Sequence, residues 1–224
     1  MGARTSGLRG RAMGVMARQF GRPAGPIGHL VTRMLARGNG GFNRWIVDEL
    51  SSSVPAPSTV IELGCGPGIA LQHLLATYRD ANVVGIDRSP VVLRSAERRN
   101  ADAVSTGRLR LVSGDVGTAG AYGPADLIVA CHVLYFWTQP VVELQAIRRA
   151  LTPTGHLALG YQLRQNMPRV SQDAFPAEGY ILYDSDEQLA AVLQEAGFAH
   201  PDVHVWGDPD RPMGRLALAI PALP

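Results

Sequence analysis

A glycine-rich run at residues 60–69, VIELGCGPGI, is the part of the sequence best suited to ligand chemistry. An apolar stretch containing the acid Glu62 leads into three glycines, at positions 64, 66 and 68. Glycine lets backbone approach a ligand where any Cβ would clash. A strand that turns into a helix in this way is the architecture of a nucleotide-binding first crossover. The spacing is G-x-G-x-G and not the G-x-G-x-x-G of a dinucleotide fingerprint, which argues against a pyrophosphate site.

Polar side chains follow three later apolar runs in a similar way. Asp87 ends the second run, Asp115 lies just after the third, and His132 ends the fourth. In doubly wound sheets, ligands bind at the carboxyl ends of the strands, near the point where the strand order reverses. We therefore expect these side chains to surround one pocket.

The runs resemble, in order, four motifs of the class I S-adenosylmethionine-dependent methyltransferases. The segments that carry the resemblance are residues 62–68, 83–87, 114–116 and 125–132. The first matches acidic-x-Gly-x-Gly-x-Gly, and the second is a strand ending in an acid, 19 positions after the last glycine. Residues 151–157, LTPTGHL, are similar to the family's Leu-x-Pro-Gly-Gly turn, with Thr154 in place of one glycine. The resemblance covers about residues 59–161.

The resemblance implies that the cofactor is S-adenosyl-L-methionine and the product S-adenosyl-L-homocysteine. Glu62 would face the amino group of the methionine portion, and Asp87 would accept from the two ribose hydroxyls. Asp115 would accept from the adenine amine, beside an apolar wall at Val116. The cofactor-binding residues implied are Glu62, Gly64, Cys65, Gly66, Gly68, Asp87, Arg88, Gly114, Asp115, Val116, Cys131 and His132. No metal is implied, because no metal-ligand spacing is found.

Several of these residues also have a structural interpretation. The glycine turn could be only a tight loop. Asp87 could cap the helix expected from Pro90, a role for which Ser89 competes. Asp115 could be a turn residue, and Cys131 a small buried filler.

His132 is the candidate catalytic base, with a structural histidine as the alternative. The sulfonium is already activated, so alignment of the reactants supplies much of the rate. A base helps only where the acceptor carries a proton of inconvenient pKa, such as that of a hydroxyl.

Aromatic residues after His132 are candidates for binding the acceptor. They either pack in the core or form a wall for an apolar acceptor. Because adjacent residues on a helix or turn do not share a face, we expect at most two of residues 135–137 to face one pocket. The candidate acceptor-binding residues are Phe20, Tyr135, Phe136, Trp137 and Tyr161.

Alternating strands and helices must position these side chains. We expect strands at 59–63, 82–86, 108–113, 125–131, 155–161, 204–206 and 216–220, and helices at 69–78, 90–100, 139–151 and 186–196. The pattern predicts an α/β fold, a doubly wound, mostly parallel seven-stranded Rossmann-like sheet with an antiparallel C-terminal hairpin.

Two regions flank or interrupt that alternation. Residues 1–58 are expected to form a basic extension with lid helices, the first at 27–36 and the second from Asn43, separated by the glycines of residues 38–41. Residues 59–224 are expected to form the methyltransferase domain, in which an insertion at about 162–184 covers the acceptor.

Composition excludes several classes of protein. All 21 basic residues are arginine, so Schiff-base chemistry and a P-loop lysine are excluded. Two cysteines cannot build a disulfide scaffold, and no apolar run is long enough for a membrane span. The N-terminus has no secretory pattern, so a reducing cytoplasm is expected. Residues 1–44 hold eight arginines and no acid, whereas residues 45–224 hold 13 arginines and 19 acids.

The sequence therefore predicts an enzyme that transfers a methyl group from S-adenosylmethionine to an oxygen, nitrogen or carbon of a small molecule, such as a secondary metabolite or a lipid-like quinone. The alternatives are a nucleic-acid methyltransferase, which the basic N-terminus suggests, and a cofactor-binding protein without transfer. A nicotinamide dehydrogenase ranks last because of the glycine spacing. Nucleic acid is not the expected partner, since the body of the chain is acidic. A monomer or homodimer is expected.

Overall fold

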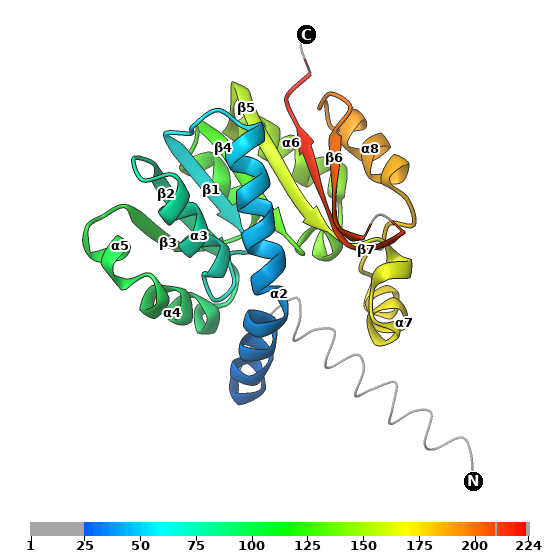
Figure 1. The fold of residues 1–224 in the computed structure, drawn as a ribbon, viewed down its shortest axis with the longest axis horizontal. Coiled ribbons are helices and arrows are strands. Elements are labelled where there is room, and N and C mark those ends of the chain that lie inside the picture. The colour runs from blue at the N-terminus through cyan, green and yellow to red at the C-terminus, as the bar shows by residue number, and fades with distance from the viewer. Residues whose placement is uncertain (1–24, 209, 223–224) are drawn as a thin grey trace.

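The sheet has seven strands and the doubly wound order predicted from the sequence. The computed structural model describes residues 25–208 and 210–222 (Figure 1). In this part of the chain the strand order is β3-β2-β1-β4-β5-β7-β6. The five strands β3, β2, β1, β4 and β5 are parallel to their neighbours, whereas β7 runs antiparallel to both β5 and β6. The strands are β1 (Thr59–Leu63), β2 (Asn82–Asp87), β3 (Leu109–Ser113), β4 (Ala125–Cys131), β5 (Leu151–Tyr161), β6 (Asp202–Asp208) and β7 (Arg211–Ala219).

Helices cover both faces of this sheet. The helices described are α2 (Gly25–Ser53), α3 (Ile69–Thr77), α4 (Pro90–Arg99), α5 (Ala101–Ser105), α6 (Pro140–Ala150), α7 (Arg169–Ala177) and α8 (Asp186–Glu195), with short 3-10 turns η1 (Val116–Ala121), η2 (Leu134–Phe136) and η3 (Arg164–Asn166). Side chains of a strand alternate between the two faces of the sheet. On β4, Ile128 packs in the core on the side of α6 and α8, and its neighbour Leu127 packs in the core on the side of α2 and α3.

The N-terminal helix differs from the prediction. The glycines of residues 38–41 do not separate two helices, because α2 runs without interruption from Gly25 to Ser53. Glycine weakens a helix by about 1 kcal/mol relative to alanine, but tertiary packing can offset that cost. Here Phe42, Ile46 and Leu50 are fully buried against the sheet. The prediction of two short helices was wrong because it weighed local propensity without this packing.

Most element boundaries in the body agree with the prediction to within a few residues. β4 spans residues 125–131 as predicted, whereas β5 begins earlier, at Leu151. Helix α5 was not predicted. The expected insertion at 162–184 contains η3 and α7. No helix among the described residues is long and apolar enough to cross a membrane.

Candidate active site

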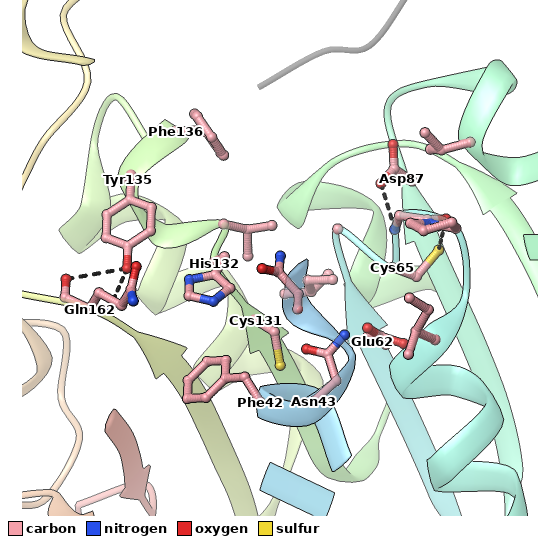
Figure 2. A pocket seen from close by; sticks show the side chains of 18 of the residues that line it. Phe42, Asn43, Glu62, Cys65, Asp87, Cys131, His132, Tyr135, Phe136 and Gln162 are labelled. Carbon is pink, nitrogen blue, oxygen red and sulfur yellow. Dashed lines mark hydrogen bonds between the residues drawn. The ribbon is translucent and has the colours of Figure 1, made fainter. Parts of the chain in front are cut away.

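A cavity of about 310 Å³ lies at the carboxyl ends of the central strands (Figure 2). Its lining includes Leu63, Asp87 and Cys131, which are the last residues of β1, β2 and β4. In the strand order, β1 and β4 are the neighbours at which the direction of winding reverses. Ligands of doubly wound sheets bind at this switch point. The predicted convergence of the strand ends on one pocket is therefore observed.

The glycine turn forms the floor of the cavity after β1. Gly64 and Gly66 have φ angles of 65° and 51°, which side chains rarely adopt. A Cβ on Gly64 would lie 2.1 Å from Cγ1 of Val133, so no larger residue fits there. A Cβ on Gly66 would meet only a backbone oxygen, 4.0 Å away, and both glycines line the cavity. The turn is therefore closed behind Gly64, and at Gly66 it leaves room for a ligand.

Asp87 connects this turn with the end of β2. One carboxylate oxygen accepts a hydrogen bond of 3.0 Å from the backbone N–H of Gly66, and the other accepts one of 2.8 Å from Ser89. Burial raises the pKa of Asp87, and the two hydrogen bonds act in the opposite direction. Each oxygen retains a lone pair for a further donor. The residue thus orders the loop and can still accept hydrogen bonds from a ligand.

Glu62, the next-to-last residue of β1, is buried and lines the cavity. Burial, reinforced by the nearby charge of Asp87, raises its pKa well above the usual value. Its Oε2 atom is buried and has no hydrogen-bond partner among the described residues. A buried acceptor without a donor is costly. A ligand with N–H groups would remove that cost, and a cationic one would also favour the ionised carboxylate.

Asp115 has the structural role that its turn position allows. Its carboxylate accepts from the N–H of Gly117 at 3.1 Å, while Thr118 accepts from the N–H of Asp115, and together they cap η1. Arg88 lies 3.9 Å away, and both side chains are about half exposed, so this pair contributes little stability. Both residues line the cavity, as do Gly114 and Val116.

Cys65 and Cys131 contribute apolar volume. Burial raises the pKa of both thiols well above the usual value, and the charge of Glu62 acts in the same direction. Both thiols therefore stay protonated at neutral pH and are poor nucleophiles. Among the described residues, no group of acidic, histidine or cysteine side chains could hold a metal ion.

His132 lies just after β4, between the part of the cavity lined by Glu62 and Asp87 and the part lined by Tyr135 and Phe136 (Figure 2). Its φ angle of 55° is unusual for a residue with a side chain. Its backbone N–H donates to the carbonyl oxygen of Gly160 at 2.8 Å. Burial lowers the pKa of its imidazole to about 4, so the ring is neutral near pH 7. Its ring centroid lies 4.8 Å from that of Phe42 and 6.3 Å from that of Tyr135.

Aromatic side chains line the cavity on the far side of His132 (Figure 2). Tyr135, Phe136 and Trp137 all contribute to the lining, so the expectation of at most two was wrong. Tyr135 and Trp137 are also buried in the core, which agrees with the packing interpretation, and their contact with an acceptor stays a prediction.

Of the other two predicted acceptor-binding residues, Tyr161 does not reach this wall. Tyr161 is fully buried, its hydroxyl donates to Asp186 at 2.6 Å, and it is not part of the cavity lining. β5 directs it into the core, and the next residue, Gln162, lines the cavity instead. Phe20 lies outside the described residues.

Sequence reasoning missed the lining residues that come from distant elements. The hairpin of β6 and β7 supplies Trp206 and Met213, and α2 supplies Phe42 and Asn43. Trp206 lies 5.2 Å from Phe42 between ring centroids. No motif marks these positions. The one available signal was a bulky aromatic next to a glycine run in α2.

The fold and the site together define a doubly wound α/β domain with a cavity at its switch point. Comparisons with known proteins find methyltransferases. Residues 61–157 match the family model described as a methyltransferase domain. The resemblance to the class I S-adenosylmethionine-dependent methyltransferases is thereby confirmed, together with the expected class of enzyme and its cofactor.

Two related proteins are both named as methyltransferases, but the match covers different shares of their length. The uncharacterized methyltransferase YdaC of Bacillus subtilis is 28% identical over 174 residues, which cover 76% of this chain and 86% of that protein. Trans-aconitate 2-methyltransferase of Methylobacterium nodulans is 34% identical over 125 residues, covering 55% of this chain and 45% of that enzyme. The matched part thus spans less than half of the trans-aconitate enzyme.

Solved structures show the same fold at low identity. Human N-acetylserotonin methyltransferase has a TM-score of 0.64 and 18% identity, over 86% of this chain and 54% of that chain. The CurJ carbon methyltransferase has a TM-score of 0.69 and 18% identity, over 86% and 58%. One of these neighbours is named for methylation of N-acetylserotonin and the other for methylation of carbon. What this chain shares with both is the fold.

Proposed function

We propose that the protein transfers the methyl group of S-adenosylmethionine to a nucleophilic atom of a flat, largely apolar small molecule. The observation that carries this proposal is the division of one cavity into an acidic side, after β1 and β2, and an aromatic side, beyond His132. The acidic side suits a ligand rich in hydrogen-bond donors, and the aromatic side suits a flat apolar acceptor.

The residues on the acidic side fit the cofactor. Gly66 leaves space over the turn, Asp87 has acceptor capacity left for ribose hydroxyls, and Glu62 has a buried acceptor without a donor. When bound, S-adenosylmethionine supplies a methyl group on a sulfonium, activated for in-line attack. The protein's part is to hold this group in line with the acceptor and to exclude water.

The charges of the cavity favour an uncharged acceptor. Among the described lining residues, Arg88 is the only one that is cationic at neutral pH, and it lies beside Asp115. A tricarboxylate such as trans-aconitate would need several cationic groups on the acceptor side. An aromatic or quinone-like molecule needs flat apolar contacts instead, which the rings around Tyr135 and Phe136 provide.

The insertion and His132 complete the acceptor side in this proposal. Met167 and Phe175, both within residues 162–184, line the cavity, in agreement with the expected covering role. His132 is neutral and can accept a hydrogen bond from an acceptor hydroxyl. With a pKa of about 4 it is too weakly basic to take a proton fully from a phenol. We therefore assign it the orientation of the nucleophile.

Calorimetric titration with S-adenosylmethionine, S-adenosylhomocysteine and NAD tests the part of the proposal that concerns the cofactor. We expect micromolar affinity for the first two and none for NAD. Acceptor assays then compare phenols, reduced quinones, trans-aconitate and short RNA by release of S-adenosylhomocysteine. Turnover of phenols or quinols supports the proposal, whereas preferred turnover of trans-aconitate or RNA contradicts it. Cofactor binding with no turnover of any acceptor would favour a binding protein.

A further inference from the structure

Helix α2 brings a polar side chain to the acidic side of the cavity. Asn43 lies on α2, outside the matched residues 61–157, and lines the cavity together with Glu62. Figure 2 shows Asn43 and Glu62 at the same end of the cavity, with Cys131 beside them. The preceding residue, Phe42, contacts His132 and Trp206 on the aromatic side. One turn of α2 therefore reaches both sides.

Two buried acceptors in this region lack donors. Neither Oδ1 of Asn43 nor Oε2 of Glu62 has a hydrogen-bond partner among the described residues. Leaving such atoms unpaired in the folded protein is unfavourable, and native structures rarely do so without a reason. Two acceptors at one end of a cavity indicate a ligand that presents several N–H donors there.

The cofactor has one group that fits this demand. Asp87 stands at the end of β2 for the ribose, and Asp115 stands farther along the sheet edge, at the end of β3, for the base. The amino-acid end of the cofactor is left for the end of β1, where Glu62 lies. Its ammonium carries three N–H donors and a positive charge, like that of lysine. A carboxylate and an amide oxygen can share these donors.

We propose that Asn43 is a cofactor-binding residue, whose side-chain oxygen accepts a hydrogen bond from the ammonium of the methionine portion alongside Glu62. The proposal rests on the function proposed above. It makes the cofactor site a joint product of the methyltransferase domain and α2. It also means that the helix carrying Phe42 to the acceptor contacts the bound cofactor.

Two ligands that differ only at the amino-acid end provide the test. S-adenosylhomocysteine has that end, and 5′-methylthioadenosine lacks it while keeping the adenosine and the thioether. Affinities are measured by calorimetry for the full chain and for Asn43→Ala. We expect Asn43→Ala to weaken S-adenosylhomocysteine about ten- to hundredfold, as for one hydrogen bond to a charged group. Binding of methylthioadenosine should change less than twofold.

Arg44→Ala is the matched control, because Arg44 is the next residue on the helix and is exposed outside the cavity lining. It should leave both affinities unchanged. Unchanged binding of S-adenosylhomocysteine to Asn43→Ala would overturn the proposal, as would an equal loss for both ligands, which indicates a general effect on folding. Failure of the wild-type protein to bind either ligand would instead overturn the proposed function.

Discussion

The two sides of the cavity differ in how the chain builds them. Apart from Asn43 of α2, the acidic side comes from strand ends and turns that lie between residues 62 and 131. The aromatic side draws on α2, η2, α7 and the β6–β7 hairpin, from Phe42 to Met213. Backbone topology therefore determines the first side, and packing between distant elements determines the second.

This difference predicts two kinds of mutational effect. Substitutions on the acidic side should change cofactor affinity and leave acceptor use intact wherever the cofactor is saturating. Substitutions on the aromatic side should change acceptor KM and leave cofactor affinity intact. His132 contacts both Phe42 and Tyr135 and stands at the boundary.

Asp87→Ala should have the largest effect. It removes the acceptor for the N–H groups of Gly66 and Ser89 as well as the expected ribose contacts. Losing two hydrogen bonds to a charged group predicts at least a hundredfold weaker binding of S-adenosylhomocysteine. Calorimetry measures this directly. Asp80→Ala, at an exposed position just before β2, is the control, and equal losses in both variants would contradict the assignment.

Phe136→Ala should affect only the aromatic side. The Phe136 ring lies 5.5 Å from Phe175 and 4.9 Å from Tyr180 between centroids, and it is only partly buried where it packs against the core. Loss of one aromatic contact predicts about a tenfold higher KM for a phenolic acceptor. Initial-rate kinetics give that value, and S-adenosylhomocysteine affinity should stay within twofold. A parallel loss of cofactor affinity would mean that the two sides are not separable.

The same division explains how much could be predicted from the sequence. The doubly wound, mostly parallel sheet and the pocket at the ends of its strands were predicted, because alternating apolar runs and the glycines and acids that follow them are local features of the sequence. The continuity of α2 was not predicted, since it depends on the burial of Phe42 and Ile46 against the sheet. The direction of Tyr161 was missed for a similar reason. A shift of one residue along a strand decides whether a side chain packs in the core or lines the cavity.

Glu62→Gln should stabilise the folded protein and weaken cofactor binding. Because the pKa of Glu62 is raised in the folded protein, the folded state holds its proton more tightly than the unfolded state. The free energy of unfolding of the wild type therefore falls as pH rises from about 4.5, the ordinary glutamate value, towards the raised pKa. Glutamine removes this cost and should stabilise the ligand-free protein at pH 8 by on the order of 1 kcal/mol.

Denaturant titrations of wild type and Glu62→Gln at pH 4 and pH 8 measure this effect. The difference should be present at pH 8 and nearly absent at pH 4, and cofactor affinity should fall. Glu97→Gln, on the exposed face of α4, should give no difference at either pH. A less stable Glu62→Gln variant at pH 8 would show that the carboxylate is already paired without ligand.

His132→Asn should have the smallest effect on turnover and is the sharpest test at the boundary. Asparagine tolerates the φ angle of 55° better than most residues and retains hydrogen-bonding groups, so the fold should be preserved. His132→Ala is the contrasting variant, because alanine removes the ring and its hydrogen-bonding groups. If His132 only orients the acceptor, kcat in His132→Asn should fall less than tenfold.

The pH dependence separates orientation from base catalysis. A pKa of about 4 keeps His132 neutral from pH 6 upward, so kcat/KM of the wild type should show no inflection from this residue between pH 6 and 8. A general base typically contributes a hundredfold or more to the rate. A loss of that size in His132→Asn, together with loss of an inflection near pH 6 to 7 seen in the wild type, would assign the proton to His132.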